Sequence, residues 1–271
     1  MKTRIITAVA LIPVLLLLLL VAPTLVTAIV WGLLLAVAAY ELLYGTGLVQ
    51  EPRLIVYSAV MAFGISIWSH FDAVHAYALL GLMLFAGILF GEMMVSHVRI
   101  TFDKICMCMV SGVLIPFLLS SLIRILVMSK IGRFMTLIPF IVAFCSDAGA
   151  YFAGRFFGQH KLAPVISQHK TIEGAIGGVV SAIAGMIIYS LILQFGFNFR
   201  VNYAYAILYG LLGALTGVFG DLCFSVVKRQ TGIKDYGNLI PGHGGVLDRF
   251  DSMMMVGPLM EALLLILPMA V

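Results

Sequence analysis

Apolar residues run through the sequence in long stretches that short polar links separate. Within the stretches, apolar and polar positions do not alternate, which favours membrane-spanning helices over the strands of an outer-membrane barrel. A helix needs roughly 20 apolar residues to cross the bilayer core. Stretches of about this length lie near residues 5–21, 24–44, 54–68, 73–95, 105–128, 134–157, 172–195, 203–227 and 252–270. The pattern predicts an all-α, polytopic membrane helix bundle with about nine transmembrane helices.

The first stretch allows two interpretations. Val26-Thr27-Ala28 faintly resembles a signal-peptidase site. However, residues 15–20 make the apolar region unusually long for a signal peptide, and the next apolar run begins at once near Pro23. These features favour the first half of a tight helical hairpin.

The composition supports an integral membrane protein. Of the 271 residues, 62% are hydrophobic and 10% are charged, whereas soluble domains carry about 25% charged residues. We expect a single membrane domain over residues 1–271 with no soluble domain appended, in which residues 1–130 carry little chemistry and residues 134–271 are catalytic. The four cysteines form no zinc-binding pattern with histidine, and the net charge of +4 is modest. No nucleic-acid partner is expected.

The distribution of positive charge predicts the orientation. Nine spans place most lysines and arginines on one side, which is the cytoplasmic side by the positive-inside rule. These residues are Lys2, Arg4, Arg53, Arg99, Lys104, Arg155, Lys161, Lys170, Lys228, Arg229, Lys234 and Arg249. Two charged loops, at about residues 155–171 and 228–250, then open on the same face and can build one site. The C-terminus would lie outside.

Most of the candidate catalytic and binding residues lie between Asp221 and Asp251. Asp221, Ser225 and Lys228 are spaced to share one face of a helix. A carboxylate inside a span costs about 2.5 to 3.5 kcal/mol, so it usually faces a cavity, an ion or a partner charge. The alternative is a structural ion pair of Asp221 with Lys228 or Arg249. Four glycines nearby, at positions 210, 213, 217 and 220, indicate close helix packing.

A glycine-rich loop, Gly237 to Gly245, precedes the last apolar stretch. Backbone N–H groups in such a loop can hold phosphate, although a glycine-rich membrane turn is equally consistent. Asp248 and Asp251 follow the loop, and the cations Lys228, Arg229, Lys234 and Arg249 surround them in sequence. Carboxylates beside cations suit a metal-chelated polyphosphate. The alternative role for the two aspartates is helix N-capping, and His243 could contact phosphate or pack the turn.

An upstream segment adds Asp147, Lys170 and Glu173. Lys170 alone could be an ordinary cytoplasmic flank, and Glu173 could be a first-turn partner of the helix dipole. Glu41, Glu92 and Arg124 also lie at or inside predicted spans, but the sequence assigns them no role.

These residues resemble the signature of the CDP-diacylglycerol synthases, the phosphatidate cytidylyltransferases. The signature has the form Ser-x-x-Lys-Arg, Lys-Asp, Pro-Gly-His-Gly-Gly and Asp-Arg-x-Asp. Here it stands as Ser225, Lys228, Arg229, Lys234, Asp235, Pro241 to Gly245, Asp248, Arg249 and Asp251. A second region of that family is similar to Asp147, Gly149 to Tyr151, Gly154, Arg155, Gly158, Lys170, Thr171, Glu173 and Gly174. The family usually has Ser-Pro ahead of Lys-Thr, where this chain has Gln168-His169.

The resemblance implies transfer of a cytidylyl group from CTP to phosphatidate, with Mg²⁺ as cofactor and a site that can hold a second cation. Asp221 and Asp248 would be metal ligands, with Asp251 and Asp147 as further ligands. Lys228 and Arg249 would act with Asp221 and Asp248 as catalytic residues. The expected substrate-binding residues are Lys170, Ser225, Arg229, Lys234, Asp235, Gly242, His243, Gly244 and Gly245. The expected location is the bacterial inner membrane, with the active site facing the cytoplasm.

Three questions stay open from sequence alone. A CTP-dependent lipid kinase would use similar phosphate-binding parts, but it would need a base for a neutral hydroxyl. An ion-coupled transporter would use Asp147 and Asp221 as a cation path. A stripe of small residues on the seventh span, Gly174, Gly178, Ser181 and Gly185, could support a homodimer or pack internally.

Overall fold

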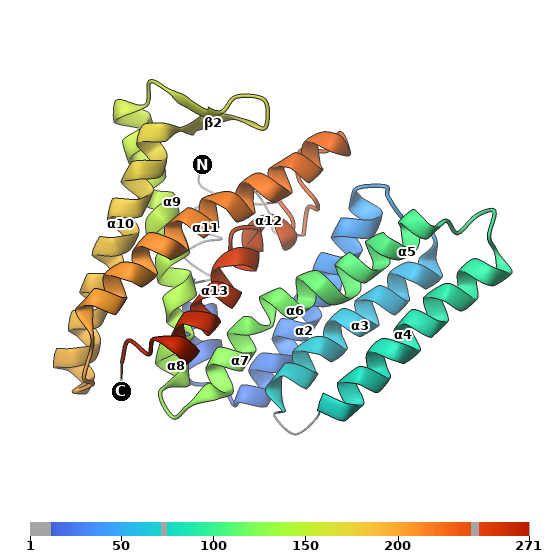
Figure 1. The fold of residues 1–271 in the computed structure, drawn as a ribbon, viewed down its shortest axis with the longest axis horizontal. Helices are drawn as coiled ribbons and strands as arrows, with labels where there is room; N and C mark the ends of the chain where they lie inside the picture. The colour runs from blue at the N-terminus through green and yellow to red at the C-terminus, as the bar shows by residue number, and fades with distance from the viewer. Residues whose placement is uncertain (1–11, 72–74, 240–243, 271) are drawn as a thin grey trace. The chain divides into compact units, whose positions relative to one another are not determined.

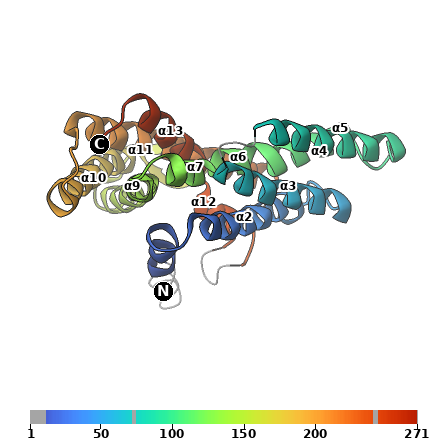
Figure 2. The ribbon, with the colours of Figure 1, turned by 90° about the horizontal axis from the view of Figure 1, so that it is seen from below.

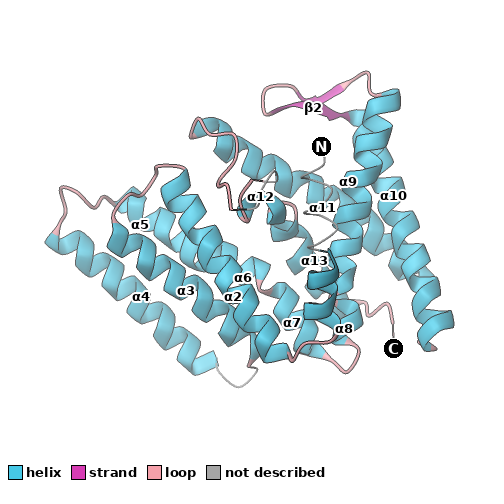
Figure 3. Cartoon of the chain, turned by 180° about the vertical axis from the view of Figure 1, so that it is seen from behind, coloured by secondary structure: helices cyan, strands magenta, loops and turns pink. Residues whose placement is uncertain are grey.

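The computed structural model of the protein describes residues 12–71, 75–239 and 244–270. Most of this part is helical, and Figure 3 shows one short pair of strands. Residues 12–20 are helical, and the further helices are α2 Thr24–Tyr40, α3 Pro52–His70, α4 His75–Val95, α5 Phe102–Met109, α6 Ile115–Leu119, α7 Ser121–Met128, α8 Gly132–Met135, α9 Leu137–Phe157, α10 Ile172–Leu191, α11 Tyr203–Gln230, α12 Leu247–Phe250 and α13 Met253–Ile266. Three π-helical turns, η1 Glu41–Gly45, η2 Val110–Leu114 and η3 Ile192–Gly196, continue α2, α5 and α10.

Seven helical segments in the described part of the chain are long and apolar enough to cross a membrane. They are Thr24–Gly45, Pro52–His70, Tyr77–Val95, Phe102–Met128, Gly132–Phe157, Ile172–Gly196 and Tyr203–Gln230, and Met253–Ile266 is a shorter apolar helix. The protein is therefore an integral membrane protein, and the predicted all-α, polytopic class is confirmed. The count of nine stays a prediction, because part of the first predicted span lies in residues 1–11, outside the described residues.

The predicted span 105–128 is not one regular helix. It is divided into α5, η2, α6 and α7. Pro116, near the start of α6, has no backbone N–H to donate to the preceding turn. The π-helical turn η2 lies directly before it, so the regular hydrogen-bond ladder is interrupted where proline cannot continue it.

The chain divides into two compact units. The first unit contains residues up to Val127 together with Gln230–Phe250, and the second contains Met128–Arg229 together with Asp251–Val271. The polar stretch from Asp221 to Asp251 is consequently shared between the units.

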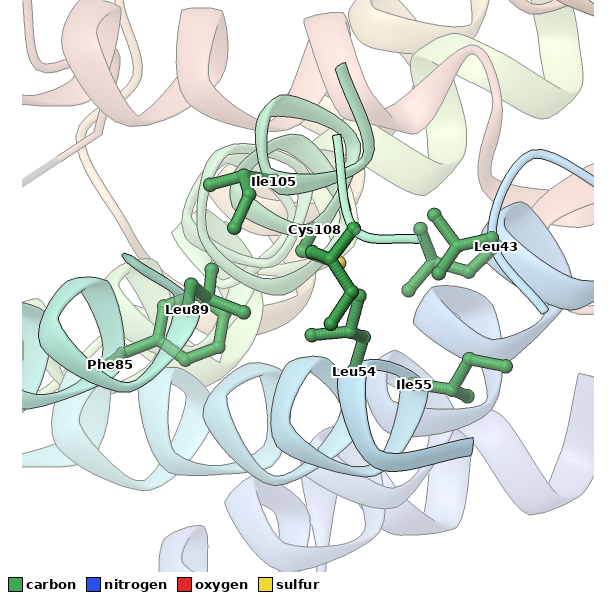
Figure 4. Close-up of a cluster of buried hydrophobic side chains, with 9 residues drawn as sticks. Leu43, Leu54, Ile55, Phe85, Leu89, Ile105 and Cys108 are labelled. Atoms are coloured by element: carbon green, nitrogen blue, oxygen red, sulfur yellow. The ribbon is translucent and has the colours of Figure 1, made fainter. Parts of the chain in front are cut away.

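In the first unit, α2 and α3 lie side by side (Figures 1 and 2). A cluster of buried apolar side chains joins η1 to the three helices that follow it in sequence, and Figure 4 shows Leu43 of η1 among them. Its labelled members are Leu43, Leu54, Ile55, Phe85, Leu89, Ile105 and Cys108. Because Leu43 is fully buried in this cluster, the π-helical turn is fixed against the core.

In the second unit, α9 and α10 pack along a seam of small residues. A Cβ atom at Gly178 would lie 3.0 Å from Ser146 O, and one at Gly174 would lie 3.0 Å from Ala150 O. The small-residue stripe of α10 therefore packs internally against α9. The predicted homodimer gains no support from it and stays a prediction.

The glycines of α11 also make close helix contacts, as the sequence indicated. A Cβ at Gly210 would lie 2.7 Å from Ile183 Cα of α10, and one at Gly213 would lie 2.6 Å from Val142 Cγ1 of α9. At Gly220 it would lie 3.0 Å from Asp251 O. Glycine thus brings the stretch of α11 that ends at Asp221 close to its neighbours.

The loop predicted at about residues 155–171 contains a β-hairpin, which Figure 1 shows beyond the ends of α9 and α10. Strand β1, Lys161–Ala163, pairs antiparallel with β2, Ser167–Thr171. Pro164 follows β1 directly and cannot donate a ladder hydrogen bond, which suits a turn position. The hairpin ends at Thr171, and α10 begins at the next residue.

Candidate functional site

Lys170 and Asp221 form an ion pair in the second unit. Lys170 lies in β2, and Asp221 lies in α11 one residue after Gly220. The two side chains are 25% and 32% exposed, so the pair is partly shielded from solvent without being buried. Lys228 and Arg249 had been the candidate partners from sequence, and Lys170 had not been considered as a partner of Asp221. The structure brings Lys170 and Asp221 together, and the role expected of each stays a prediction.

A cavity of about 210 Å³ lies at this ion pair. Asp147 and Tyr151 of α9, His169 and Lys170 of β2, and Asp221 of α11 contribute to its lining. The volume is below the range of about 300–1,000 Å³ that is typical for sites enclosing drug-sized ligands. The cavity is therefore suited to part of a ligand, such as a phosphate group, while the rest of the ligand lies outside it.

Asp251 brings a third carboxyl group into the electrostatic environment of this site. Burial raises the pKa of Asp251 to about 7, and the negative charges of Asp221 and Asp147 act in the same direction. The Ser252 N–H, which donates to Asp251 Oδ1 at 2.8 Å, and the charge of Lys228 act against the rise. Two aspartates of the second unit therefore act on Asp251, and a bound positive charge would favour the carboxylate form of Asp251.

The donor chemistry of these aspartates fits a hard divalent cation. Mg²⁺ is usually held through one or two carboxylates together with water and substrate phosphates, so it does not require a cage of protein ligands. Among the described residues, no three His, Cys, Asp or Glu side chains are grouped closely enough to hold a metal ion as they stand. Asp221 instead makes its ion pair with Lys170 and accepts a hydrogen bond from Ser225 Oγ at 3.3 Å.

Several bonds hold the β-hairpin that carries Lys170. Glu173 accepts the backbone N–H groups of Gln159 at 3.1 Å and His160 at 3.2 Å, and its Oε1 lies 2.6 Å from His160 Nδ1. Arg229, at the end of α11, donates from Nε to Ile166 O at 3.3 Å. Thr171 caps α10, because its Oγ1 accepts the Gly174 N–H. Glu173 therefore does more than serve as a first-turn partner of the helix dipole.

A second polar cluster lies in the first unit, around the turn of residues 244–248. Asp248 is 5% exposed, and its Oδ2 accepts the backbone N–H groups of Tyr236 at 2.8 Å and Gly245 at 3.0 Å. Gly244 has a φ of +85°, a conformation that glycine adopts without strain. Asp248 is thus bonded to the backbone of the turn, and its expected role as a metal ligand stays a prediction.

Glu41 is a residue of this cluster that sequence reasoning missed. It is 3% exposed, and its two carboxylate oxygens accept the backbone N–H groups of Val246 at 3.0 Å and Leu247 at 2.9 Å. The available signal was a carboxylate at the end of a predicted span, which is unusual enough to indicate a function. Its partners could not be inferred, because 205 and 206 residues separate them from it in sequence.

The bonds of Glu41 and Asp248 also bear on the predicted phosphate site of the glycine loop. The N–H groups of Gly245, Val246 and Leu247 already donate to these two carboxylates. Phosphate contacts in this segment are therefore better assigned to side chains than to these three N–H groups. Lys234, Asp235 and Arg249 are exposed, whereas Gly242 and His243 lie outside the described residues.

A family model described as "Cytidylyltransferase family" matches residues 2–267. This chain belongs to the cytidylyltransferase family. The match covers both the cavity residues and the turn, so the family inferred from the motifs is confirmed.

Relatives of this cytidylyltransferase-family chain include the phosphatidate cytidylyltransferases of three staphylococci. The Staphylococcus saprophyticus protein is 40% identical over 134 residues, which cover 49% of this chain and 50% of the relative. The Staphylococcus aureus (strain COL) protein is 42% identical over 134 residues, with the same coverage. The Staphylococcus epidermidis (strain ATCC 12228) protein is 42% identical over 129 residues, or 48% of each chain. The chain thus spans about half the length of these relatives in the matched region.

Proposed function

We propose that the protein transfers the cytidylyl group of CTP to phosphatidate and so produces CDP-diacylglycerol and pyrophosphate. The observation that carries this proposal is the Lys170–Asp221 pair at a cavity lined from α9, β2 and α11. It joins residues of both motif regions in a chain of the cytidylyltransferase family. The activity named for the staphylococcal relatives agrees with it.

The reaction is a substitution at the α-phosphorus of CTP. An oxygen of the phosphatidate phosphate forms the new bond to this phosphorus, while the bond to the oxygen bridging toward the β-phosphorus breaks. Pyrophosphate leaves with that bridging oxygen. A phosphate monoester has a second pKa near 6, so phosphatidate is largely dianionic at neutral pH. The reaction therefore needs little help from a general base.

The main requirement is to bring two anions together and to stabilise the leaving group. Lys170 provides a positive charge in the cavity, and Lys228 lies within electrostatic range of Asp251. Asp221 would hold Mg²⁺ together with water and substrate phosphates, and Asp147, Asp251 and Asp248 are the further predicted ligands. When bound, Mg²⁺ would neutralise phosphate charge and favour departure of pyrophosphate. Lys234, Arg229 and Arg249 are proposed to contact the phosphates of CTP or of the lipid.

We further propose that this site faces the cytoplasm from the bacterial inner membrane. The unequal distribution of lysine and arginine along the sequence supports that orientation. Phosphatidate would enter from the bilayer, so that its headgroup meets CTP at the membrane surface.

Labelled CTP tests the proposed reaction directly. The purified full chain is incubated with phosphatidate in mixed micelles and with CTP labelled at the α- or the γ-phosphate, with and without Mg²⁺. We expect only the α-label to enter the lipid, and only when Mg²⁺ is present. Transfer of the γ-label would instead identify a lipid kinase.

Binding measurements separate the enzyme from a transporter. If no label enters lipid under any condition and CTP does not bind saturably, the cytidylyltransferase proposal is wrong for this chain. Movement of a cation across a sealed vesicle membrane would then support the transporter interpretation.

A further inference from the structure

Glu41 occupies an unusual position for an acidic residue. It begins the π-helical turn η1 at the end of α2, within the membrane-spanning segment Thr24–Gly45. π-helical turns often occur at functional sites. A carboxylate in such a segment is costly unless it is well partnered, and both oxygens of Glu41 accept backbone N–H groups from the distant turn of residues 244–248.

The turn is shaped to receive this carboxylate. A Cβ atom at Gly245 would lie 2.5 Å from both carboxylate oxygens of Glu41, and one at Gly237 would also collide with Glu41. A Cβ at Gly45, in the same π-helical turn as Glu41, would collide with the backbone oxygen of Tyr236. Three glycines thus permit the close approach that the hydrogen bonds require.

The arrangement specifies a carboxylate at position 41. Val246 N donates to Oε1 and Leu247 N donates to Oε2, so both oxygens act as acceptors. A glutamine has one acceptor oxygen and one NH₂ donor, and it would place that donor against a backbone N–H. An alanine would leave two buried N–H groups without acceptors.

The bonds of Asp248 extend the effect of Glu41 to the segment before the loop. Asp248 follows Leu247 in the chain, and its Oδ2 accepts the N–H groups of Gly245 and Tyr236. Tyr236 is 2% exposed, and it is two residues from Lys234, which is exposed. A continuous path of bonds therefore connects Glu41 with Asp248 and with the backbone that carries Lys234.

We propose that Glu41 is a positioning residue for nucleotide binding, which holds the turn of residues 244–248 and, through the bonds of Asp248 to Tyr236, holds Lys234 in the arrangement that binds CTP phosphates. This inference rests on the proposed function. It assigns an influence on CTP affinity to the membrane-spanning segment Thr24–Gly45, which carries no residue of the expected site.

Equilibrium binding and steady-state kinetics test the proposal on the full chain in lipid nanodiscs. E41Q keeps one acceptor and E41A keeps none. We expect the Kd and KM for CTP to rise about tenfold in E41Q and about a hundredfold in E41A, in proportion to the charged hydrogen bonds lost. The KM for phosphatidate should change less than about twofold.

Glu92→Gln provides a matched control. Glu92 is also an acidic residue in a membrane-spanning helix of the first unit, where it accepts from Tyr57 Oη at 3.2 Å and lies 3.9 Å from Arg53 Nη1. We expect E92Q to leave the KM for CTP unchanged. A purely structural role for Glu41 would lower the amount of active protein in E41Q and E41A while leaving both KM values unchanged, and that result would overturn the proposal.

Hydrogen exchange provides a readout that does not depend on catalysis. The amide groups of Val246 and Leu247 should exchange about tenfold or more faster in E41A than in the unchanged protein, and those of α10 should not. Equal exchange rates of these two amide groups in E41A and in the unchanged protein would show that Glu41 does not hold the turn. The unchanged protein could fail to transfer cytidylyl groups while Val246 and Leu247 still exchange faster in E41A. In that case the proposed function is wrong, but Glu41 does hold the turn. Faster exchange with unaltered CTP affinity would refute the positioning role.

Discussion

The two polar clusters of this protein use the same residue types in different ways. In the second unit, Asp221 pairs with the side chain of Lys170 beside a cavity, and both side chains are partly exposed. In the first unit, Glu41 and Asp248 are buried and accept backbone N–H groups. The ion pair in the second unit can separate so that each side chain binds a ligand of opposite charge. The two carboxylates in the first unit hold the backbone of the turn.

This difference shows how a membrane protein can carry several buried or half-buried carboxylates for separate reasons. A side-chain ion pair at a cavity leaves its groups available to an incoming ion, because either partner can rotate away. A carboxylate bonded to two amide groups loses those bonds if it moves. Substitutions should therefore alter chemistry in the first case and the geometry of the chain in the second.

The largest effect is expected at Asp221. Asp221→Asn removes the negative charge but retains the size of the side chain, so we expect cytidylyl transfer to fall by at least about a thousandfold. Gel filtration and the thermal midpoint should remain close to those of the unchanged protein. Asp103→Asn, at an exposed position of α5, serves as the control and should be fully active. Substantial activity in D221N would rule out the proposed metal role.

Lys170 should show a smaller loss with a distinctive signature. Lys170→Ala removes a positive charge from the cavity, and turnover should fall by about a hundredfold. Because Asp221 then lacks its ion-pair partner, the affinity for Mg²⁺ without CTP should increase, as titration calorimetry would show. Lys161→Ala, in the same hairpin, should change neither quantity. An unaltered turnover in K170A would place the chemistry elsewhere.

Gly245 tests the other cluster through stability. Gly245→Ala would place a Cβ 2.5 Å from the Glu41 carboxylate oxygens, so we expect a loss of about 1–3 kcal/mol in the free energy of unfolding. A Cβ at Gly91 of α4 meets nothing within 4 Å. Gly91→Ala should therefore be neutral or stabilising by up to about 1 kcal/mol. Thermal or denaturant unfolding in detergent compares the two, and equal stability would argue against a tight turn.

The smallest change is expected at Ser225. Its hydroxyl donates to Asp221 Oδ1 at 3.3 Å, a long hydrogen bond that orients the carboxylate. Ser225→Ala should lower turnover by less than about tenfold and should leave Kd for CTP almost unaltered. A loss as large as that of D221N would mean that the hydroxyl contacts substrate directly.

Much of the fold could be predicted from hydropathy. The span expected at residues 24–44 is Thr24–Gly45, and the span expected at 172–195 is Ile172–Gly196, because bilayer thickness sets the length of an apolar helix. The hairpin at Lys161–Thr171 was not predicted. Its strands are three and five residues long, too short to give a periodic pattern.

The sequence predicted which residues belong to the candidate site, but it did not predict which of them contact each other. Motif spacing selected both Lys170 and Asp221, yet the expected partners of Asp221 were residues near it in sequence. The actual pairing depends on packing of α9, α10 and α11 through small residues, and one sequence does not reveal which faces meet. The contact between Glu41 and Val246 was unpredictable for the same reason, since nothing near either residue indicates the other.

The glycine seam between α9 and α10 also affects the order in which the protein can assemble during synthesis. The two helices are neighbours in the chain, so their contacts can form before later helices leave the ribosome. The hairpin that carries Lys170 precedes α11 in the chain, so it can also form before α11 is inserted. Asp221 can then meet its counter-charge as soon as α11 is inserted, which would lower the cost of inserting a helix that carries a carboxylate.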